Sequence, residues 1–362
     1  MVCVICGGIV LRRPVIRANA FAFAFLVVVA ANPTDPFTAG CQLSFLAVFV
    51  LLWGVSKWLA PDPVDPLDQL IDESRSPLER TLRWAWRVVR MAFAISFLLG
   101  VALAPLVLFW QNLVTPLGIL LGPPLIVLTS VALIAGFLLL IVSPFGLELP
   151  FALVTKWSLS ACEALVRLAE KIPGGWVYAS APSVWWLTGF YALLAAVVLL
   201  DAKWRRRSGI ALAAWSLFGV ALGLYRVPSD EARITFLSVG HGCCVVVETP
   251  DGRVLLYDAG TISGPDSVRR VVAPFLWHRG VRRIDELFLS HADLDHFNGV
   301  PELLKRFAVG RVTLTPSFAE KTSPGVAVAL AAIEKHDVPW RTVRAGDRLS
   351  AGAVSLESVL TA

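Results

Sequence analysis

The run from residue 114 to residue 143 contains no charged side chain, and it limits the fold more than any other part of the sequence. A helix needs roughly 20 mostly apolar residues to cross the hydrocarbon core of a bilayer. Only 16% of the 362 residues are charged, whereas soluble domains usually carry about 25%. The run therefore predicts a membrane-spanning helix, and the composition predicts several of them.

The polar residues gather late in the chain, which predicts two domains. All five histidines lie at or beyond position 241. We expect a polytopic transmembrane domain over 1–226 and a soluble domain over 230–362. The net charge of +5 suits anionic partners such as nucleic acid or lipid headgroups, although membrane proteins also use Lys and Arg to set their topology.

The transmembrane domain contains further apolar runs of spanning or nearly spanning length. Pro123 and Pro124 interrupt the uncharged run, and because a proline removes a helical hydrogen bond, a kinked helix and a broken, re-entrant helix are both open. Residues 61–87 predict a polar loop with a short amphipathic segment. Residues 146–172 mix charged and apolar positions, as in a helix that lies in the membrane interface. The other candidate spans are 16–31, 37–60, 88–110, 184–200 and 208–224.

Basic residues between the spans predict the orientation. The segment KWRRR at 203–207 separates the last two candidate spans, and the positive-inside bias places it in the cytoplasm. The soluble domain that follows is then outside the cytoplasmic (inner) membrane. Arg12, Arg13 and Arg17 and the basic stretch 75–90 also favour the cytoplasm. Six simple membrane passes cannot place all three basic segments on the cytoplasmic side. The number of spans and the side of the N-terminus therefore stay open.

The sequence after residue 233 alternates short apolar strands with helices. The turn PDG at 250–252 joins two of these strands. Strands and helices in this order predict a sheet that is covered by helices. The expected strands are 234–239, 244–249, 253–258, 286–290 and 311–315, and the expected helices are 301–307 and 325–336.

Four side chains of metal-binding types follow the apolar strand ELFLS within six residues: His291, Asp293, Asp295 and His296. Loops that a rigid scaffold positions often carry function, and imidazole and carboxylate groups suit zinc, manganese or iron. The cluster therefore predicts a metal site, with a polar loop and incidental histidines as the alternative. Asp258 ends an earlier strand and is either a turn aspartate or a buried carboxylate that supports the metal loop.

The same residues resemble a known family. The order S-H-x-D-x-D-H at 290–296, with Asp258 upstream, resembles the metallo-β-lactamase fold, in which a histidine usually stands at the position of Asp293. The D-x-D-H form resembles the ComEC-type competence proteins, which import single-stranded DNA during natural transformation. Two further stretches agree. FLSVGHG at 236–242 resembles the family's F-x-D-V-G-Q-G strand, and NPTDPFTAGCQLSFLAVF at 32–49 resembles its membrane signature.

The resemblance implies a polytopic α-helical membrane domain followed by a partial α/β metallo-β-lactamase-like domain, an αβ/βα sandwich. It implies a DNA-uptake channel with an outward-facing hydrolase, a nuclease that degrades the strand that is not imported. The implied partners are single-stranded DNA, duplex DNA at entry, membrane lipids and other competence proteins, while the oligomeric state stays open. His291 and Asp293 are expected to hold one divalent ion, zinc or manganese, and Asp295 and His296 a second. Asp295 is also the expected catalytic residue, because it could orient the attacking water.

Some positions depart from the family pattern. His241 replaces the glutamine of G-Q-G and is expected to line the site, and Cys243 stands where an aspartate usually follows. The downstream histidine and bridging aspartate of the fold are missing from the sequence, and so is the N-terminal globular domain that many members carry, so we expect a chain truncated at both ends. Two other functions are therefore open: a DNA transporter with a catalytically inert hydrolase domain, and a membrane-anchored metallohydrolase of another phosphoester.

Overall fold

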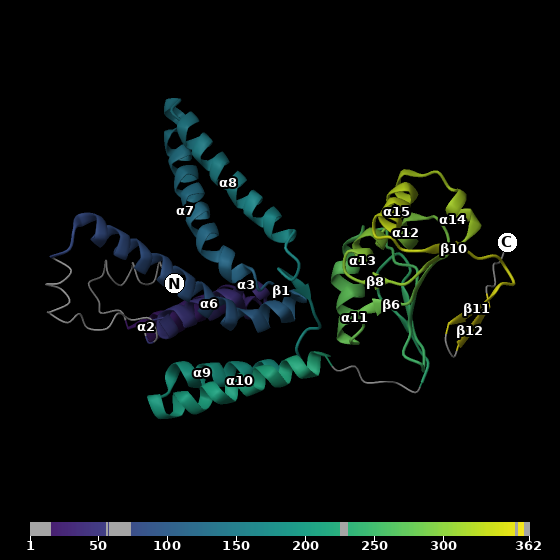
Figure 1. Ribbon diagram of the computed structural model, residues 1–362, viewed down its shortest axis with the longest axis horizontal. Helices are drawn as coiled ribbons and strands as arrows, with labels where there is room; N and C mark the ends of the chain where they lie inside the picture. The colour runs from purple at the N-terminus through teal and green to yellow at the C-terminus, as the bar shows by residue number, and fades with distance from the viewer. Residues whose placement is uncertain (1–15, 56, 58–73, 225–230, 352–353, 358–362) are drawn as a thin grey trace. The chain divides into compact units, whose positions relative to one another are not determined.

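The computed structural model divides into two compact units. One unit is Met1–Val177 with Pro182–Ser216, and the other is Tyr178–Ala181 with Leu217–Ala362. The first is helical, and the second contains a sheet (Figure 1). Two expected features, the basic pair Arg12 and Arg13 and most of the polar loop before residue 74, lie outside the described residues. The structure describes residues 16–55, 57, 74–224, 231–351 and 354–357.

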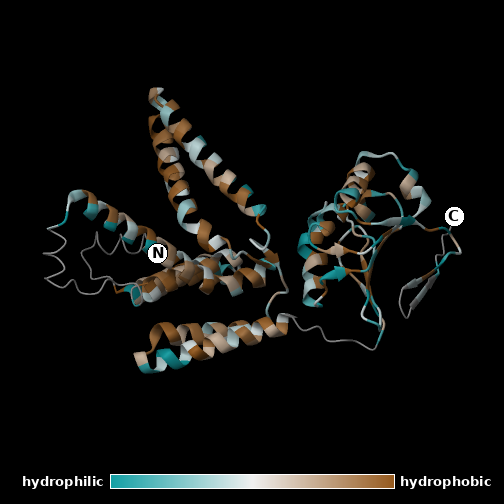
Figure 2. Ribbon diagram, in the orientation of Figure 1, coloured by the Kyte–Doolittle hydropathy of each residue, from teal (hydrophilic) through white to brown (hydrophobic). Residues whose placement is uncertain are grey.

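The first unit consists of helices that are apolar along most of their length (Figure 2). Three of them, α6, α7 and α8, are long and apolar enough to cross a membrane, judged by length and composition. The helices are α2 (Arg17–Ala31), α3 (Ala39–Phe49), α6 (Pro77–Gln111), α7 (Gly118–Val142), α8 (Leu149–Glu170), α9 (Val184–Leu199) and α10 (Ala202–Leu224). Shorter elements are η1 (Asp35–Phe37), the π-helical η2 (Val50–Val55), η3 (Ser143–Phe145), β1 (Leu113–Val114) and β2 (Val177–Tyr178).

Two helices differ from the sequence-based expectation. The hydroxyl of Ser76 accepts a hydrogen bond from the amide of Glu79 and caps α6, so the helix begins well before the expected start of the span and includes the amphipathic segment. The basic segment KWRRR forms the first turns of α10 rather than a loop, because Lys and Arg are good helix formers. The interfacial placement of α8 stays a prediction.

A hydroxyl from α6 compensates for the hydrogen bond that Pro123 removes from α7. Pro123 has no amide hydrogen, so the carbonyl of Ile119, four residues earlier, lacks its helical donor. Ser96 Oγ donates to that carbonyl at 3.0 Å, and α7 continues as one helix through the prolines. A Cβ at Gly122 would lie 2.3 Å from Ser96 Oγ, and one at Gly100 would lie 2.8 Å from an Ile119 carbon. Small residues thus permit the close approach of the two helices.

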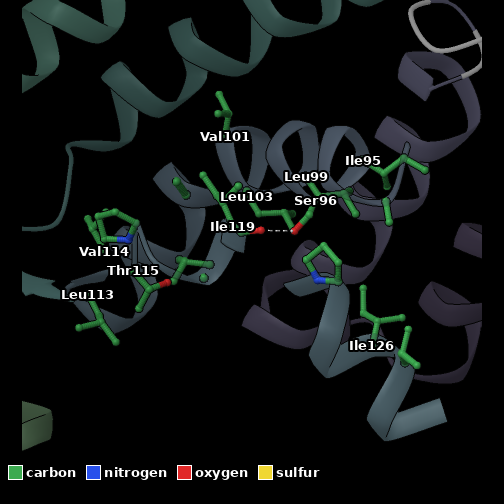
Figure 3. Close-up of a pocket in the computed structure, with 18 residues that line it drawn as sticks. Ile95, Ser96, Leu99, Val101, Leu103, Leu113, Val114, Thr115, Ile119 and Ile126 are labelled. Carbon is green, nitrogen blue, oxygen red and sulfur yellow. Dashed lines mark hydrogen bonds between the residues drawn. The ribbon is translucent and has the colours of Figure 1, made fainter. Parts of the chain in front are cut away.

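Beside this contact, α6, α7 and β1 line a half-open pocket of about 690 Å³ (Figure 3). Its lining is almost entirely aliphatic and includes Leu99, Leu103 and Ile126. The hydrogen bond from Ser96 to Ile119 lies at its wall, as the dashed line marks. The sequence left the proline pair open as a kink or a break; α7 continues through both prolines, and the hydrogen bond from Ser96 satisfies the carbonyl that Pro123 releases.

A six-stranded mixed sheet forms the centre of the second unit, in the order β10-β9-β7-β5-β4-β3. β3, β4 and β5 are antiparallel, whereas β5, β7, β9 and β10 are parallel. Gly252 has a φ of +83° in the PDG turn between β4 and β5, a conformation that glycine adopts without strain. The strands are β3 (Arg233–Phe236), β4 (Val245–Glu248), β5 (Val254–Tyr257), β7 (Glu286–Leu289), β9 (Val312–Leu314) and β10 (Trp340–Thr342).

Helices α11 (Ala273–His278), α13 (Val300–Leu304) and α15 (Pro324–Lys335) cover one face of the sheet (Figure 1). Alternate strand residues such as Leu256, Leu287 and Val312 are fully buried there in one core. On the other face, Ile234 and Phe236 are 62% and 79% exposed. The remaining elements are η4 (Val268–Val272), α12 (Leu294–Phe297), α14 (Pro316–Glu320), β6 (Arg283–Ile284), β8 (Ala308–Val309), β11 (Arg348–Ala351) and β12 (Val354–Glu357).

An ion-pair cluster lies on α13. The carboxylate of Glu302 is 2.6 Å from Lys305 Nζ and 2.5 Å from Arg306 Nη1. Burial acts to raise the pKa of Glu302, but the hydrogen bonds and charges of these two cations outweigh it and lower the pKa below its ordinary value.

Candidate metal centre

The predicted metal ligands lie where neighbouring parallel strands end. β5 leads into Asp258, β7 into Ser290 and His291, and β9 into Thr315. The carboxyl ends of parallel strands meet at one edge of a sheet, which is where open α/β folds place their sites. Thr315 Oγ1 donates to the carbonyl of Ser290 at 2.8 Å and joins two of these strand ends. The sheet therefore sets the position of the loop that carries the cluster.

Asp258 is fully buried and accepts hydrogen bonds at both carboxylate oxygens. Oδ1 accepts from the amide of Ser290 at 2.8 Å. Oδ2 accepts from Ser290 Oγ at 2.7 Å and from His296 Nδ1 at 2.8 Å. The residue has a φ of +57°, which is costly for a residue with a Cβ. Asp258 is thus both a turn residue and a buried carboxylate that holds the loop, so the two interpretations left open by the sequence are not exclusive.

These contacts determine which nitrogen of each histidine carries the proton. A carboxylate only accepts, so His296 Nδ1 donates to Asp258, and the single hydroxyl proton of Ser290 is also directed at Asp258. Ser290 Oγ then accepts from His291 Nδ1 at 2.9 Å. In the neutral form of each ring Nε2 is then the nitrogen without a proton, and the two ring centroids are 3.9 Å apart. Carboxylates orient metal-binding histidines in this way.

Each histidine has one loop carboxylate near its free nitrogen. His291 Nε2 is 3.5 Å from Asp293 Oδ2, and His296 Nε2 is 3.8 Å from Asp295 Oδ2. Two ligands of one tetrahedral cation, each about 2.0–2.2 Å from it, lie roughly 3.4 Å apart, which is close to both of these distances. The structure therefore brings the four residues together in the pairs that the resemblance implied, while their metal-binding roles stay predictions.

Lys321, which follows α14, also reaches the loop. Its Nζ donates to the carbonyl of Ala292 at 2.8 Å and to Asp293 Oδ1 at 3.0 Å. The hydrogen bond and charge of Lys321 hold the pKa of Asp293 below its ordinary value. The side chain of Asp293 is well exposed, so water screens this ion pair. A cation at Asp293 would share the carboxylate with an ammonium group.

Backbone contacts hold the surrounding segments together. A Cβ at Gly260 would lie 2.5 Å from the carbonyl carbon of Asp295, and one at Gly242 would lie 2.3 Å from the carbonyl oxygen of Gly260. Because these atoms belong to the main chain, only glycine fits at either position. The amide of Cys243 donates to the carbonyl of Asp295 at 3.3 Å. The segment before β4 is thus fixed against the loop that carries the predicted metal ligands.

Cys243, rather than His241, joins the group of potential ligands. One donor atom each of Cys243, Asp258 and His296 lies within 4.8 Å of the other two. Burial and the charge of Asp258 raise the pKa of the Cys243 thiol. His241 is exposed, and its carbonyl accepts a hydrogen bond from Thr261 Oγ1 at 3.1 Å. The expectation that its side chain lines the site stays a prediction.

The donor set fits a divalent cation. The Nε2 atoms of two imidazoles lie near carboxylates, and the Cys243 thiol is grouped with Asp258 and the His296 ring. Neutral histidine, carboxylate and cysteine are the ligands that zinc and related ions use. Ser290, Lys321 and Cys243 also belong to this arrangement, although they were not predicted as site residues.

Comparison with known proteins gives two family matches. Residues 1–204 match the Competence protein family, and residues 237–356 match the Metallo-beta-lactamase superfamily. ComE operon protein 3 of Bacillus subtilis (strain 168) is 25% identical over 368 residues, which cover 95% of this chain and 43% of the relative. Competence protein ComA of Neisseria gonorrhoeae is 31% identical over 293 residues, which cover 78% of this chain and 36% of the relative.

The chain spans less than half the length of these two relatives. The expected fold class is confirmed, because a helical region with candidate membrane spans precedes a β-rich metallo-β-lactamase domain. That superfamily implies divalent metal binding. The chain is therefore a membrane protein that belongs to the ComEC-type competence protein family, with a metallo-β-lactamase domain after its helices.

Proposed function

We propose that the chain acts in DNA uptake and that its α/β unit is a metal-dependent phosphodiesterase for the strand that is not imported. The proposed phosphodiesterase activity rests on one observation. In a chain of a competence family, two histidines present unprotonated Nε2 atoms to the same region, each beside a carboxylate. A histidine-rich loop without function would have no need for a buried carboxylate that sets both tautomers.

The residues have distinct roles in this proposal. His291 with Asp293, and Asp295 with His296, would hold one or two divalent ions, which when bound neutralise phosphoryl charge and lower the pKa of a water. Asp258 keeps His296 in the ligating tautomer directly and acts on His291 through Ser290. Asp295 is half-buried beside His296 and is placed to orient the attacking water and accept its proton.

The test is DNA cleavage by the full chain purified in detergent, with Mn²⁺ or Zn²⁺ and end-labelled single-stranded and duplex DNA. We expect cleavage by the wild type and a loss of at least about 100-fold in Asp295→Asn, since a general base contributes that much. Asp266→Asn is the matched control, because Asp266 is an exposed aspartate that pairs with Arg270. Equal cleavage by wild type and Asp295→Asn would remove the catalytic role of Asp295.

One observation favours a second candidate, a transporter whose hydrolase domain is inert. Lys321 already occupies one oxygen of Asp293, and this ion pair competes with a cation. Metal binding without cleavage of any phosphoester would favour this candidate. Cleavage of a small phosphodiester but not of DNA would instead favour a membrane-anchored metallohydrolase of another substrate.

The proposal also includes an orientation, with the α/β unit outside the inner membrane. Four basic residues in the first turns of α10 support it (Lys203, Arg205, Arg206 and Arg207), because such residues favour the cytoplasmic side. Alkaline phosphatase fused after Ala362 is active only outside the cytoplasm, so it should be active in this fusion. An inactive phosphatase fusion together with a fluorescent cytoplasmic reporter fusion would reverse the orientation.

A further inference from the structure

The ammonium group of Lys321 reaches the loop that carries the predicted metal ligands. Its Nζ lies 2.8 Å from the carbonyl oxygen of Ala292 and 3.0 Å from Asp293 Oδ1. Among the described residues, no other lysine or arginine forms an ion pair with Asp258, Asp293 or Asp295. These three carboxylates therefore have one ammonium group as their counter-charge before a metal ion binds.

The fold holds Lys321 at this place. It follows α14, which is capped because Thr315 Oγ1 accepts a hydrogen bond from the amide of Phe318. Phe318 is fully buried and packs edge-to-face on Phe297 of α12, with ring centroids 5.1 Å apart. The carbonyl of Phe318 accepts a hydrogen bond from the amide of Lys321 at 3.4 Å. The lysine is thus anchored at its backbone, and the carbonyl that holds its side chain belongs to the buried residue Ala292.

The lysine and a metal ion can use Asp293 together. Lys321 contacts Oδ1, whereas Oδ2 is the oxygen that lies 3.5 Å from His291 Nε2. An ammonium group has three protons, and the two printed contacts of Lys321 use two of them within the described part of the chain. The third proton is available to another acceptor, and the half-exposed side chain leaves it accessible to a substrate.

The charge of the site calls for such a group. A phosphodiester is an anion, and the carboxylates of Asp258, Asp293 and Asp295 repel it. One divalent ion and one ammonium group together balance these three negative charges. Lysine is a common phosphate-binding residue, since its compact charge can approach an oxygen from several directions.

We propose that Lys321 is a substrate-binding residue, whose ammonium group donates a hydrogen bond to a phosphoryl oxygen of the DNA strand while Asp293 holds the metal ion. The inference rests on the proposed function, since it concerns the same site and substrate. The same ammonium group also opposes the metal ion, because two cations at one carboxylate repel each other. Loss of its charge should therefore weaken phosphate binding and strengthen zinc binding, whereas loss of a merely structural lysine would not move the two affinities in opposite directions.

The test is calorimetric titration of the full chain, purified in detergent and stripped with a chelator, first with Zn²⁺ and then with inorganic phosphate as the probe. We expect the wild type to bind phosphate only when it is loaded with zinc. In Lys321→Gln, phosphate affinity should fall about tenfold, the lower end for a charge-assisted hydrogen bond. Zinc affinity should rise about two- to fivefold, as expected for a charge interaction that water screens.

Two further variants serve as controls. Lys321→Arg keeps the positive charge and should hold both affinities within about threefold of the wild type. Lys335→Gln removes an exposed lysine at the end of α15 and should change neither affinity.

The outcomes separate this inference from the proposed function. Equal phosphate affinity in the wild type and Lys321→Gln, or weaker zinc binding in Lys321→Gln, overturns the inference and leaves the proposed function standing. Zinc-dependent phosphate binding that requires Lys321, without cleavage of DNA, supports the inference and removes the nuclease from the proposed function. A wild type that binds no zinc overturns both.

Discussion

Asp258→Asn is the substitution that most directly tests how the metal loop is held. Asp258 is buried and accepts three hydrogen bonds from Ser290 and His296. In either orientation of the asparagine amide, its NH₂ group faces at least one of these donors. A hydrogen bond to a charged group contributes about 1.5–3 kcal/mol, so the loss of one or two should lower the local stability by about 2–4 kcal/mol.

Hydrogen exchange of the detergent-solubilised full chain can measure this loss. The amides of β5 and β7 flank the substituted position, and their exchange reports the free energy of local opening. Since about 1.4 kcal/mol corresponds to a factor of ten, exchange should accelerate roughly 30- to 1000-fold. The exposed Asp266→Asn control should change exchange by no more than about twofold, as expected for a surface position.

The same substitution should also weaken metal binding, by about 10- to 100-fold, because His296 loses the acceptor that fixes its tautomer. Isothermal titration with Zn²⁺ measures this effect. If Asp258→Asn exchanges and binds zinc like the wild type, then the carboxylate does not hold the loop, and the account of both histidines is refuted.

Three further predictions concern other parts of the chain. Ser96→Ala should destabilise the packing of α6 and α7 by about 1 kcal/mol, because the carbonyl of Ile119 loses its donor; thermal unfolding in detergent against Ser216→Ala checks this. Gly260→Ala should displace the main chain at Asp295 and reduce zinc affinity without preventing expression, as titration would show. The lowered pKa of Glu302 means that its ion pairs stabilise the fold above the ordinary glutamate pKa of about 4.3. That stabilisation should disappear as the pH falls through the lowered value, and unfolding of Glu302→Gln should depend less on pH in this range.

Much of the α/β unit could be predicted from the sequence, because its strands are short apolar runs bounded by turn residues. The expected strands 286–290 and 311–315 correspond to β7 and β9, and the expected helix 325–336 corresponds to α15. The order of the strands could not be derived in this way, since parallel pairing depends on contacts between residues that are far apart in the chain. β10 and α11 were not predicted, because β10 (WRT) is not an apolar run and α11 has only six residues.

The loop of the candidate site was predicted from four residues in one stretch. The residues that hold this loop in place were not predicted. Ser290 directly precedes His291, but a serine at the end of a strand has no distinctive pattern until the strand order brings it against Asp258. Lys321 lies far downstream, and Cys243 far upstream, of the residues that they approach. Residues that are far apart in the chain and come together only in the folded structure form no recognisable pattern in the sequence.

The bond between Ser96 and Ile119 has a mechanical consequence for the helical unit. In an ordinary helix, bending at a proline changes the conformation of that helix alone. Here the acceptor released by Pro123 is satisfied by a neighbour, so flexing α7 at that point means detaching it from α6. A change in the angle of α7 at Pro123 would therefore also strain its hydrogen bond to Ser96, so the shape of α7 and its packing against α6 depend on each other.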